Sequence, residues 1–286
     1  MLVSPFTPLF FRQNVKTDGL PSKYIQVFAP TDVILIEVIG EENHYPNAEI
    51  KNILSGISNV IVWNYWDINA EQRLYFTTIT GLTVGCYKVN ISGIGDSQPF
   101  KITTDETDLS QTTLIQYSNK DNRQRLDAVF HINKMQYFFD FRVPGGFQDN
   151  GWTFGVDNEQ FVTELSDIVE LYAMDSTQNT FTLGTNIGCP VWYAELLNRL
   201  LCCNYIYFDG VRYARKDTSV PEMTIQMEGL NSFVFKQILQ KVKNINPAIE
   251  DKNQTIIRRI DNTYYNAIDI NSDGNSNNYY QRLIKY

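Results

Sequence analysis

Short stretches in which apolar and polar residues alternate fill the first hundred positions of the chain. The clearest of them cover residues 23–40, 59–68 and 72–79. A later stretch places Tyr87, Val89 and Ile91 on one face. Glycine, proline and asparagine separate these stretches at intervals of roughly 8–12 residues, a spacing typical of small β-sandwiches. The pattern predicts an immunoglobulin-like sandwich over residues 1–104.

A polar stretch at 103–113 marks the expected end of this sandwich. The following segments are again β-patterned, so residues 105–247 predict a second, β-rich domain of the α+β class. Its segment 135–143 carries aromatic side chains on both faces. A strand of that kind is typically pressed against a neighbour. We therefore expect Phe139 and Phe141 to contact another subunit.

One short helix is predicted near residues 190–202. Trp192, Leu196 and Leu200 recur there at the spacing of one helical face. The segment that follows predicts a β-hairpin, because an Asp-Gly pair at 209–210 is a strong signal for a two-residue turn.

Two other segments leave alternatives open. Residues 144–155 are rich in glycine and predict a loop, in which Trp152 is a candidate contact residue. Trp152 could stack on a sugar or on a protein, and we favour a protein because tryptophan is common at interface hot spots. Residues 223–243 fit both a strand and a helix, and we favour strands because β-patterned segments surround them.

The composition changes from residue 248 onward. Segment 248–286 is rich in asparagine and tyrosine and shows no core periodicity, so it cannot bury enough surface to fold alone. We interpret it as an extended C-terminal assembly arm, with a disordered tail as the alternative. Its candidate contact residues are Tyr264, Tyr265, Tyr279 and Tyr280.

Composition and charge exclude several classes of partner. Hydrophobic residues make up 43% and charged residues 20% of the 286, so the chain can bury a core. The net charge of −8 provides no surplus of cations for general nucleic-acid binding. No stretch reaches roughly 18 uninterrupted apolar residues, and the first residues do not resemble a signal peptide, so neither a membrane partner nor export is expected.

The chain is poor in catalytic chemistry. It has two histidines, His44 and His131, without metal-site spacing, and it lacks nucleophile, phosphate and dinucleotide motifs. We therefore expect no enzyme activity and no cofactor. A weak candidate metal site, Asp269, Asn271 and Asp273, matches the opening of a calcium loop, but Tyr280 stands where that loop needs a glutamate.

Two stretches carry a resemblance to a known group of proteins. The segments 86–102 (CYKVNISGIGDSQPFKI) and 167–223, which begins DIVELYAM, resemble structural virion proteins of crAss-like and related tailed phages of Bacteroidales. The resemblance implies a subunit of a tail-barrel ring, neck or tail hub. It also implies a cyclic homo-oligomer that contacts other tail, portal or hub proteins, in a virion assembled in the host cytoplasm.

Two functions remain open from the sequence. The leading hypothesis is a structural subunit that assembles through the arm, residues 144–155 and the strand at 136–141. The alternative is a carbohydrate-binding adhesin or tail-tip host-recognition module that uses Trp152.

Overall fold

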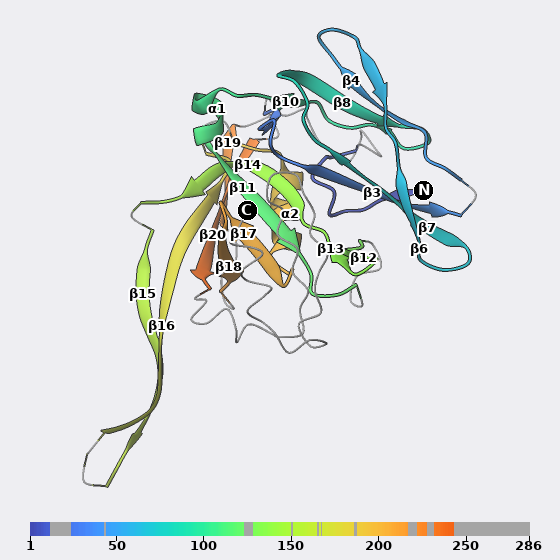
Figure 1. Cartoon of the computed structure of the whole chain (residues 1–286). Coiled ribbons are helices and arrows are strands. Elements are labelled where there is room, and N and C mark those ends of the chain that lie inside the picture. Colours follow the sequence, from blue (N-terminus) through green and yellow to red (C-terminus); the bar gives the residue numbers. More distant parts are fainter. Residues whose placement is uncertain are drawn as a thin grey trace, which may run out of the picture.

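The computed structural model of the chain describes residues 1–11, 24–42, 44–122, 128–149, 151–164, 166, 168–185, 188–216, 222–227 and 232–242. Strands dominate this part of the chain, and its two helices are short (Figure 1). The protein is therefore mainly β, as the sequence predicts.

The N-terminal residues form two sheets that face each other as a sandwich (Figure 1). One sheet has the order β1 (Leu2–Val3), β3 (Ile34–Glu41), β7 (Gln72–Ile79) and β6 (Asn64–Asp67). The other has the order β2 (Gln26–Phe28), β10 (Phe100–Ile102), β8 (Gly85–Ile91), β4 (Ala48–Asn52) and β5 (Ser58–Val60), and β9 (Gly95–Asp96) pairs with β8.

Alternation along the strands builds the core of the sandwich. Tyr87, Val89 and Ile91 of β8 are buried, as their shared face predicts. They join residues of β3, Phe100 and Trp63 in one apolar cluster between the sheets. The predicted immunoglobulin-like sandwich is confirmed by this arrangement of two packed sheets.

The second part of the chain closes into a β-barrel. Six strands pair in an unbroken circle: β11 (Thr112–Ser118), β14 (Phe139–Phe147), β16 (Ile168–Leu183), β20 (Ser232–Lys241), β18 (Val211–Arg215) and β17 (Tyr205–Phe208). Closure removes the free edges that an open sheet would present. Strand β19 (Glu222–Met227) adds to β20, and β15 (Thr153–Val162) adds to β16. The strands predicted within 223–243 are confirmed for the described residues.

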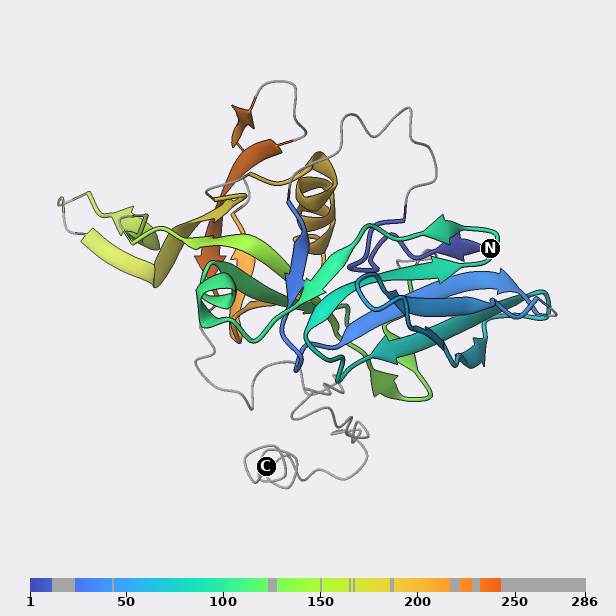
Figure 2. The same ribbon diagram turned by 90° about the horizontal axis from the view of Figure 1, so that it is seen from above.

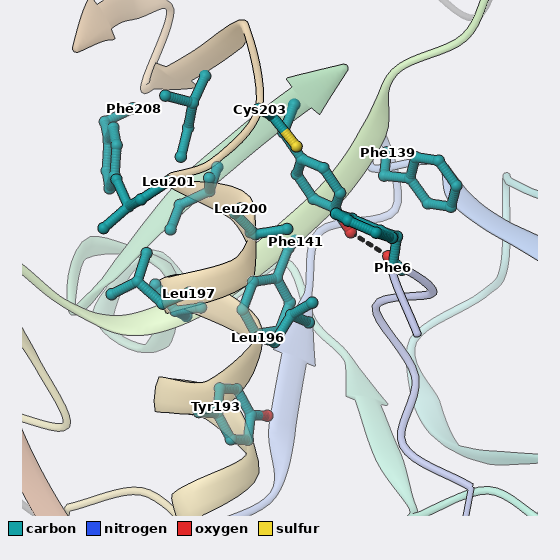
Figure 3. Close-up of a cluster of buried hydrophobic side chains, with 14 of the residues drawn as sticks. Phe6, Phe139, Phe141, Tyr193, Leu196, Leu197, Leu200, Leu201, Cys203 and Phe208 are labelled. Atoms are coloured by element: carbon teal, nitrogen blue, oxygen red, sulfur yellow. Dashed lines mark hydrogen bonds between the residues drawn. The ribbon is translucent and has the colours of Figure 1, made fainter. Parts of the chain in front are cut away.

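Helix α2 (Val191–Leu200) packs its apolar side chains against the barrel (Figure 3). Tyr193, Leu196, Leu197 and Leu200 are buried, which confirms the predicted helix. The hairpin β17–β18 turns at Asp209 and Gly210, whose φ angles of 45° and 80° fit the turn that this pair predicts.

Two small elements complete the described residues. Helix α1 (Glu106–Ser110) lies in the polar stretch between sandwich and barrel, where Asp105 caps it through the Thr107 N–H. The hairpin of β12 (His131–Ile132) and β13 (Met135–Gln136) lies on the side of the barrel that faces the sandwich (Figure 1).

Three sequence predictions are wrong in detail. Phe139 and Phe141 are fully buried in the chain's own core, because Tyr117 stacks on Phe139 and Tyr193 stacks on Phe141 (Figure 3). Residues 144–147 and 153–155 belong to β14 and β15 and do not form a loop. The sequence pattern, β-patterned at 167–174 and again at 180–186, predicts two strands there, but residues 168–183 form one long strand.

The sandwich and the barrel share buried contacts. The Arg142 guanidinium on β14 holds the Asp32 carboxylate of the sandwich at 2.7 Å and 2.9 Å. Phe6 is fully buried in the barrel's cluster, and the Tyr117 hydroxyl donates a hydrogen bond to its carbonyl (Figure 3). The two units therefore pack as one body in this structure.

Candidate protein–protein interface

A long β-hairpin, formed by β15 and β16, extends away from the barrel (Figure 1). The two strands pair from Thr153↔Gln178 to Val162↔Ile168. Only the end of β16, from Gln178 onward, also pairs with β20. The ten residues of β15 span roughly 30 Å at the usual rise of a strand, so the hairpin reaches well beyond the barrel wall.

Large apolar side chains on the hairpin are exposed. Phe154 is 78% exposed, Val162 is 60% exposed and Leu171 is 61% exposed. The other exposed members are Val156, Phe161, Ile168 and Met174. Exposed apolar side chains that gather on one element mark a contact surface more strongly than scattered ones do.

These apolar residues occupy both faces of the hairpin. Phe154 and Val156 lie on one face, and Phe161 lies on the other because successive side chains of a strand alternate. A two-stranded hairpin without a covered face is marginally stable in water. Association with another molecule would cover both faces and fix the hairpin's position.

The hairpin is also acidic. No lysine, arginine or histidine occurs between Arg142 and Arg199. Residues 153–177 contain six acidic residues: Asp157, Glu159, Glu164, Asp167, Glu170 and Asp175. A surface that fits this hairpin therefore needs to be apolar and basic.

Aromatic rings lie at the root of the hairpin. The rings of Trp152 and Phe154 are nearly parallel, 8° apart in orientation, with centroids separated by 6.5 Å. Together with Thr177 and Lys241 they line an open hollow of about 420 Å³. Trp152 is 42% exposed, so the structure leaves this predicted contact residue accessible.

A second exposed apolar surface lies at the end of the sandwich. Leu54, Val60 and Val62 are exposed at 79%, 77% and 80%, and Ile57 lies between them in the chain. Val60 belongs to β5, an edge strand with one free side. Edge strands with exposed apolar residues readily pair with other chains.

Candidate metal ligands do not gather in the described part of the chain. No cluster of three or more His, Cys, Asp or Glu side chains that could hold a metal occurs among these residues. His131 is half-buried, its ring nitrogen lies 3.0 Å from the Asn119 carbonyl, and burial lowers its pKa. That environment fits the structural role that its place in a strand predicts.

The described residues also include no helix of the length and apolarity needed to cross a membrane.

Some predicted residues cannot be placed. Tyr264, Tyr265, Tyr279 and Tyr280 lie outside the described residues, as do the calcium-loop candidates Asp269, Asn271 and Asp273. Sequence reasoning missed the apolar residues of the hairpin. A signal was present, because Phe161, Val162 and Ile168 flank a short polar tip and no basic residue lies nearby.

Comparison with known proteins adds no family. Neither the known family models nor the curated proteins match the sequence. Among solved structures, the chain is similar to the IG1–IG1 heterodimer of ZIG-8 and RIG-5, with 12% identity over 34% of this chain and 91% of that chain. The TM-score of 0.19 is too low to indicate a shared overall fold.

Proposed function

We propose that the protein is a structural subunit of a tailed-phage virion, in a tail-barrel ring, neck or tail hub, and that it acts by assembly with other subunits. The observation that carries this proposal is the projecting hairpin β15–β16, whose exposed apolar side chains occupy both faces. Protein interfaces bury this kind of surface. The assignment to a virion rests on the sequence resemblance.

The rest of the molecule suits such a role. The closed barrel and the sandwich provide a rigid body, and the hairpin and the Leu54–Val62 surface lie on different units of it. A subunit with two separate contact surfaces can bind two neighbours at once. In this proposal the C-terminal arm, residues 248–286, adds a third contact.

The test is incorporation into native particles. A tagged chain with Phe154→Ser, Val156→Ser, Phe161→Ser and Val162→Ser is supplied during infection, and purified particles are analysed by mass spectrometry. We expect at least a tenfold loss of incorporation with an unchanged melting temperature, because these side chains are exposed in the free chain.

The matched control carries Ile25→Ser and Ile68→Ser, two exposed apolar residues on the sandwich. It should enter particles like the wild type. Equal incorporation of the hairpin variant would show that the hairpin is not the contact. A wild-type chain that is absent from purified particles would overturn the virion assignment.

A carbohydrate-binding adhesin or tail-tip module is the second candidate. The nearly parallel rings of Trp152 and Phe154 beside an open hollow favour it, because stacked aromatic faces are amphipathic binding surfaces. A glycan array tests it. A specific signal that Trp152→Ala abolishes would support the adhesin, and an array without signal for the full chain would reject it.

A further inference from the structure

The hollow at the root of the hairpin lies on the face of the sheet that lines the barrel. Phe154 of β15 pairs with Thr177 of β16, and the register between β16 and β20 continues this row to Lys241. In the next row inward, Asn179 and Leu239 are paired and buried. Side chains two positions apart on a strand share a face, so Thr177 and Lys241 lie on the same side as these buried residues. The hollow is therefore a mouth of the barrel, at the point where β16 leaves it (Figure 1).

Two aromatic rings form one wall of this mouth. The planes of the Trp152 and Phe154 rings differ by 8°, so both rings present a face in the same direction. The turn before them is fixed, because the Gly151 N–H donates to the Gln148 carbonyl at 3.1 Å. A Cβ atom at Gly151 would lie 2.6 Å from Oδ1 of Asn179, so the glycine allows the turn to lie close against β16. The wall is thus held by the backbone while its rings stay exposed.

Lys241 provides the mouth with a cation. The Val242 N–H donates to the Arg212 carbonyl at 3.0 Å, which fixes the end of β20 beside β18. The Lys241 side chain is exposed, and no ion pair among the described residues includes it. An acidic residue on the same face, Asp175, lies one row further out, roughly 7 Å along the strand from Thr177. An ammonium group with three donors suits an anionic ligand group.

The acidic residues of the hairpin leave the mouth accessible to an anion. Asp157 lies on the opposite face from Phe154, because successive side chains of a strand alternate. Glu159 is five positions from Phe154, which corresponds to roughly 17 Å along the strand. At physiological salt, exposed charges that far apart are largely screened from each other.

The groups in the mouth match the chemistry of a sugar acid. A pyranose ring has a face of C–H groups that packs on an aromatic ring, and hydroxyl groups that need hydrogen-bond partners. The hydroxyl of Thr177 lines the hollow together with the two rings and Lys241. A volume of about 420 Å³ lies in the range of ligand sites, and the mouths of β-barrels are common places for them.

We infer that this mouth binds an acidic saccharide, with a sugar ring on Trp152 and Phe154 and its carboxylate on Lys241. The site rests on the carbohydrate-binding function proposed above as the second candidate, and it names the ligand class. It is independent of the contacts through which the chain would assemble into a virion.

The test is an array of paired oligosaccharides, read with the purified full-length chain. Each acidic oligosaccharide, ending in galacturonate, glucuronate or sialic acid, is paired with the same oligosaccharide after reduction of its carboxylate to an alcohol. The two members of a pair differ only in the group that would meet Lys241. We expect at least one acidic member to bind about fivefold or more tightly than its neutral partner, measured by isothermal titration calorimetry. This preference should shrink as sodium chloride is raised.

Three variants separate the roles of the cation and the rings. Lys241→Gln should lower the affinity for the acidic member to that of the neutral member, whereas Lys241→Arg should keep the preference because the charge remains. Trp152→Ala should weaken binding of both members, since both stack on the ring. The matched control, Lys236→Gln, removes an exposed lysine from the opposite face of the same strand and should bind like the wild type. All four changes are at exposed positions, so the melting temperature should not change.

Equal affinity of the wild type for both members of every pair, or a Lys241→Gln variant that keeps the preference, would overturn the inference. Equal binding that Trp152→Ala abolishes would leave the carbohydrate-binding function standing with a neutral ligand. An array without any signal would reject both the site and that function. Incorporation into particles would still decide the structural function, so the failures are distinguishable.

Discussion

Glu37 is a fully buried carboxyl between the sandwich and the barrel. The Val129 N–H donates to its Oε2 at 3.2 Å, whereas Oε1 has no hydrogen-bond partner among the described residues. Burial raises the pKa of Glu37 from its ordinary value of 4.5 to about 8, and the single backbone hydrogen bond opposes this only in part. Glu37 is therefore a neutral acid at pH 7.

This carboxyl makes stability depend on pH. Between pH 4.5 and about 8 the folded chain holds a proton that the unfolded chain has lost, so the free energy of unfolding falls as the pH rises. The full fall is on the order of 5 kcal/mol. Denaturant unfolding of Glu37→Gln at several pH values should show a much flatter profile, because the amide does not titrate. Glu41→Gln, an exposed change at the end of the same strand, should keep the wild-type slope.

Gly145 lies in strand β14, within the stretch 144–155 that the sequence predicts as a loop. Its φ is 132°, and a Cβ atom there would lie 2.0 Å from the Thr182 carbonyl oxygen across the β14–β16 pair. Gly145→Ala should cost at least about 2 kcal/mol of unfolding free energy, measured by denaturant titration. Gly210→Ala is the matched control, since its φ is also positive but its Cβ meets nothing within 4 Å. Equal losses would contradict a steric role for Thr182.

Elements whose pattern is local were predictable. Alternating burial identified β8, and helical spacing identified α2. The closed barrel was not predictable, because the pair β16–β20 joins residues 178–183 to residues 235–240. The sequence pattern predicts two strands in place of β16 because the residues between them, 175–179, are all polar.

The candidate site was predictable only in part. Trp152 was identified from its residue type, and it is exposed at the hairpin root. Phe139 and Phe141 were assigned to an interface because aromatic residues on both faces need cover. Tyr117 and Tyr193 of the same chain supply that cover, and sequence alone cannot distinguish an internal neighbour from an external one.

The projecting hairpin should be much less protected from exchange than the barrel strands in the free chain. Residues 153–162 and 168–177 pair only with each other, whereas the barrel strands have neighbours on both sides. Hydrogen–deuterium exchange of the free protein should therefore be at least tenfold faster at the amides of Phe154–Phe161 than in β11. Assembly should slow exchange in the hairpin and leave β11 unchanged. Protection in the free monomer equal to that of β11 would contradict an uncovered hairpin.

At the scale of the whole molecule, sandwich and barrel should unfold together. Phe6 and Leu35 from the N-terminal part belong to the barrel's apolar cluster, and the Arg142–Asp32 pair is largely shielded from water. Asp140 on β14 also accepts a hydrogen bond from the Val33 N–H at 3.0 Å. Calorimetry of the wild type should show one cooperative transition, with equal calorimetric and van't Hoff enthalpies.

Arg142→Met should lower that transition. The change leaves the Asp32 carboxylate, 3% exposed, without its cation, and breaking a buried ion pair costs about 3–5 kcal/mol. For a chain of this size the loss corresponds to a fall of roughly 10 °C in Tm. Adding Asp32→Asn removes the unpaired charge and should recover part of the loss, because the apolar contacts around Phe6 and Leu35 remain. Two separate transitions in the wild type would show that the sandwich and the barrel fold independently. An Arg142→Met variant as stable as the wild type would show that this ion pair does not stabilise the contact between them.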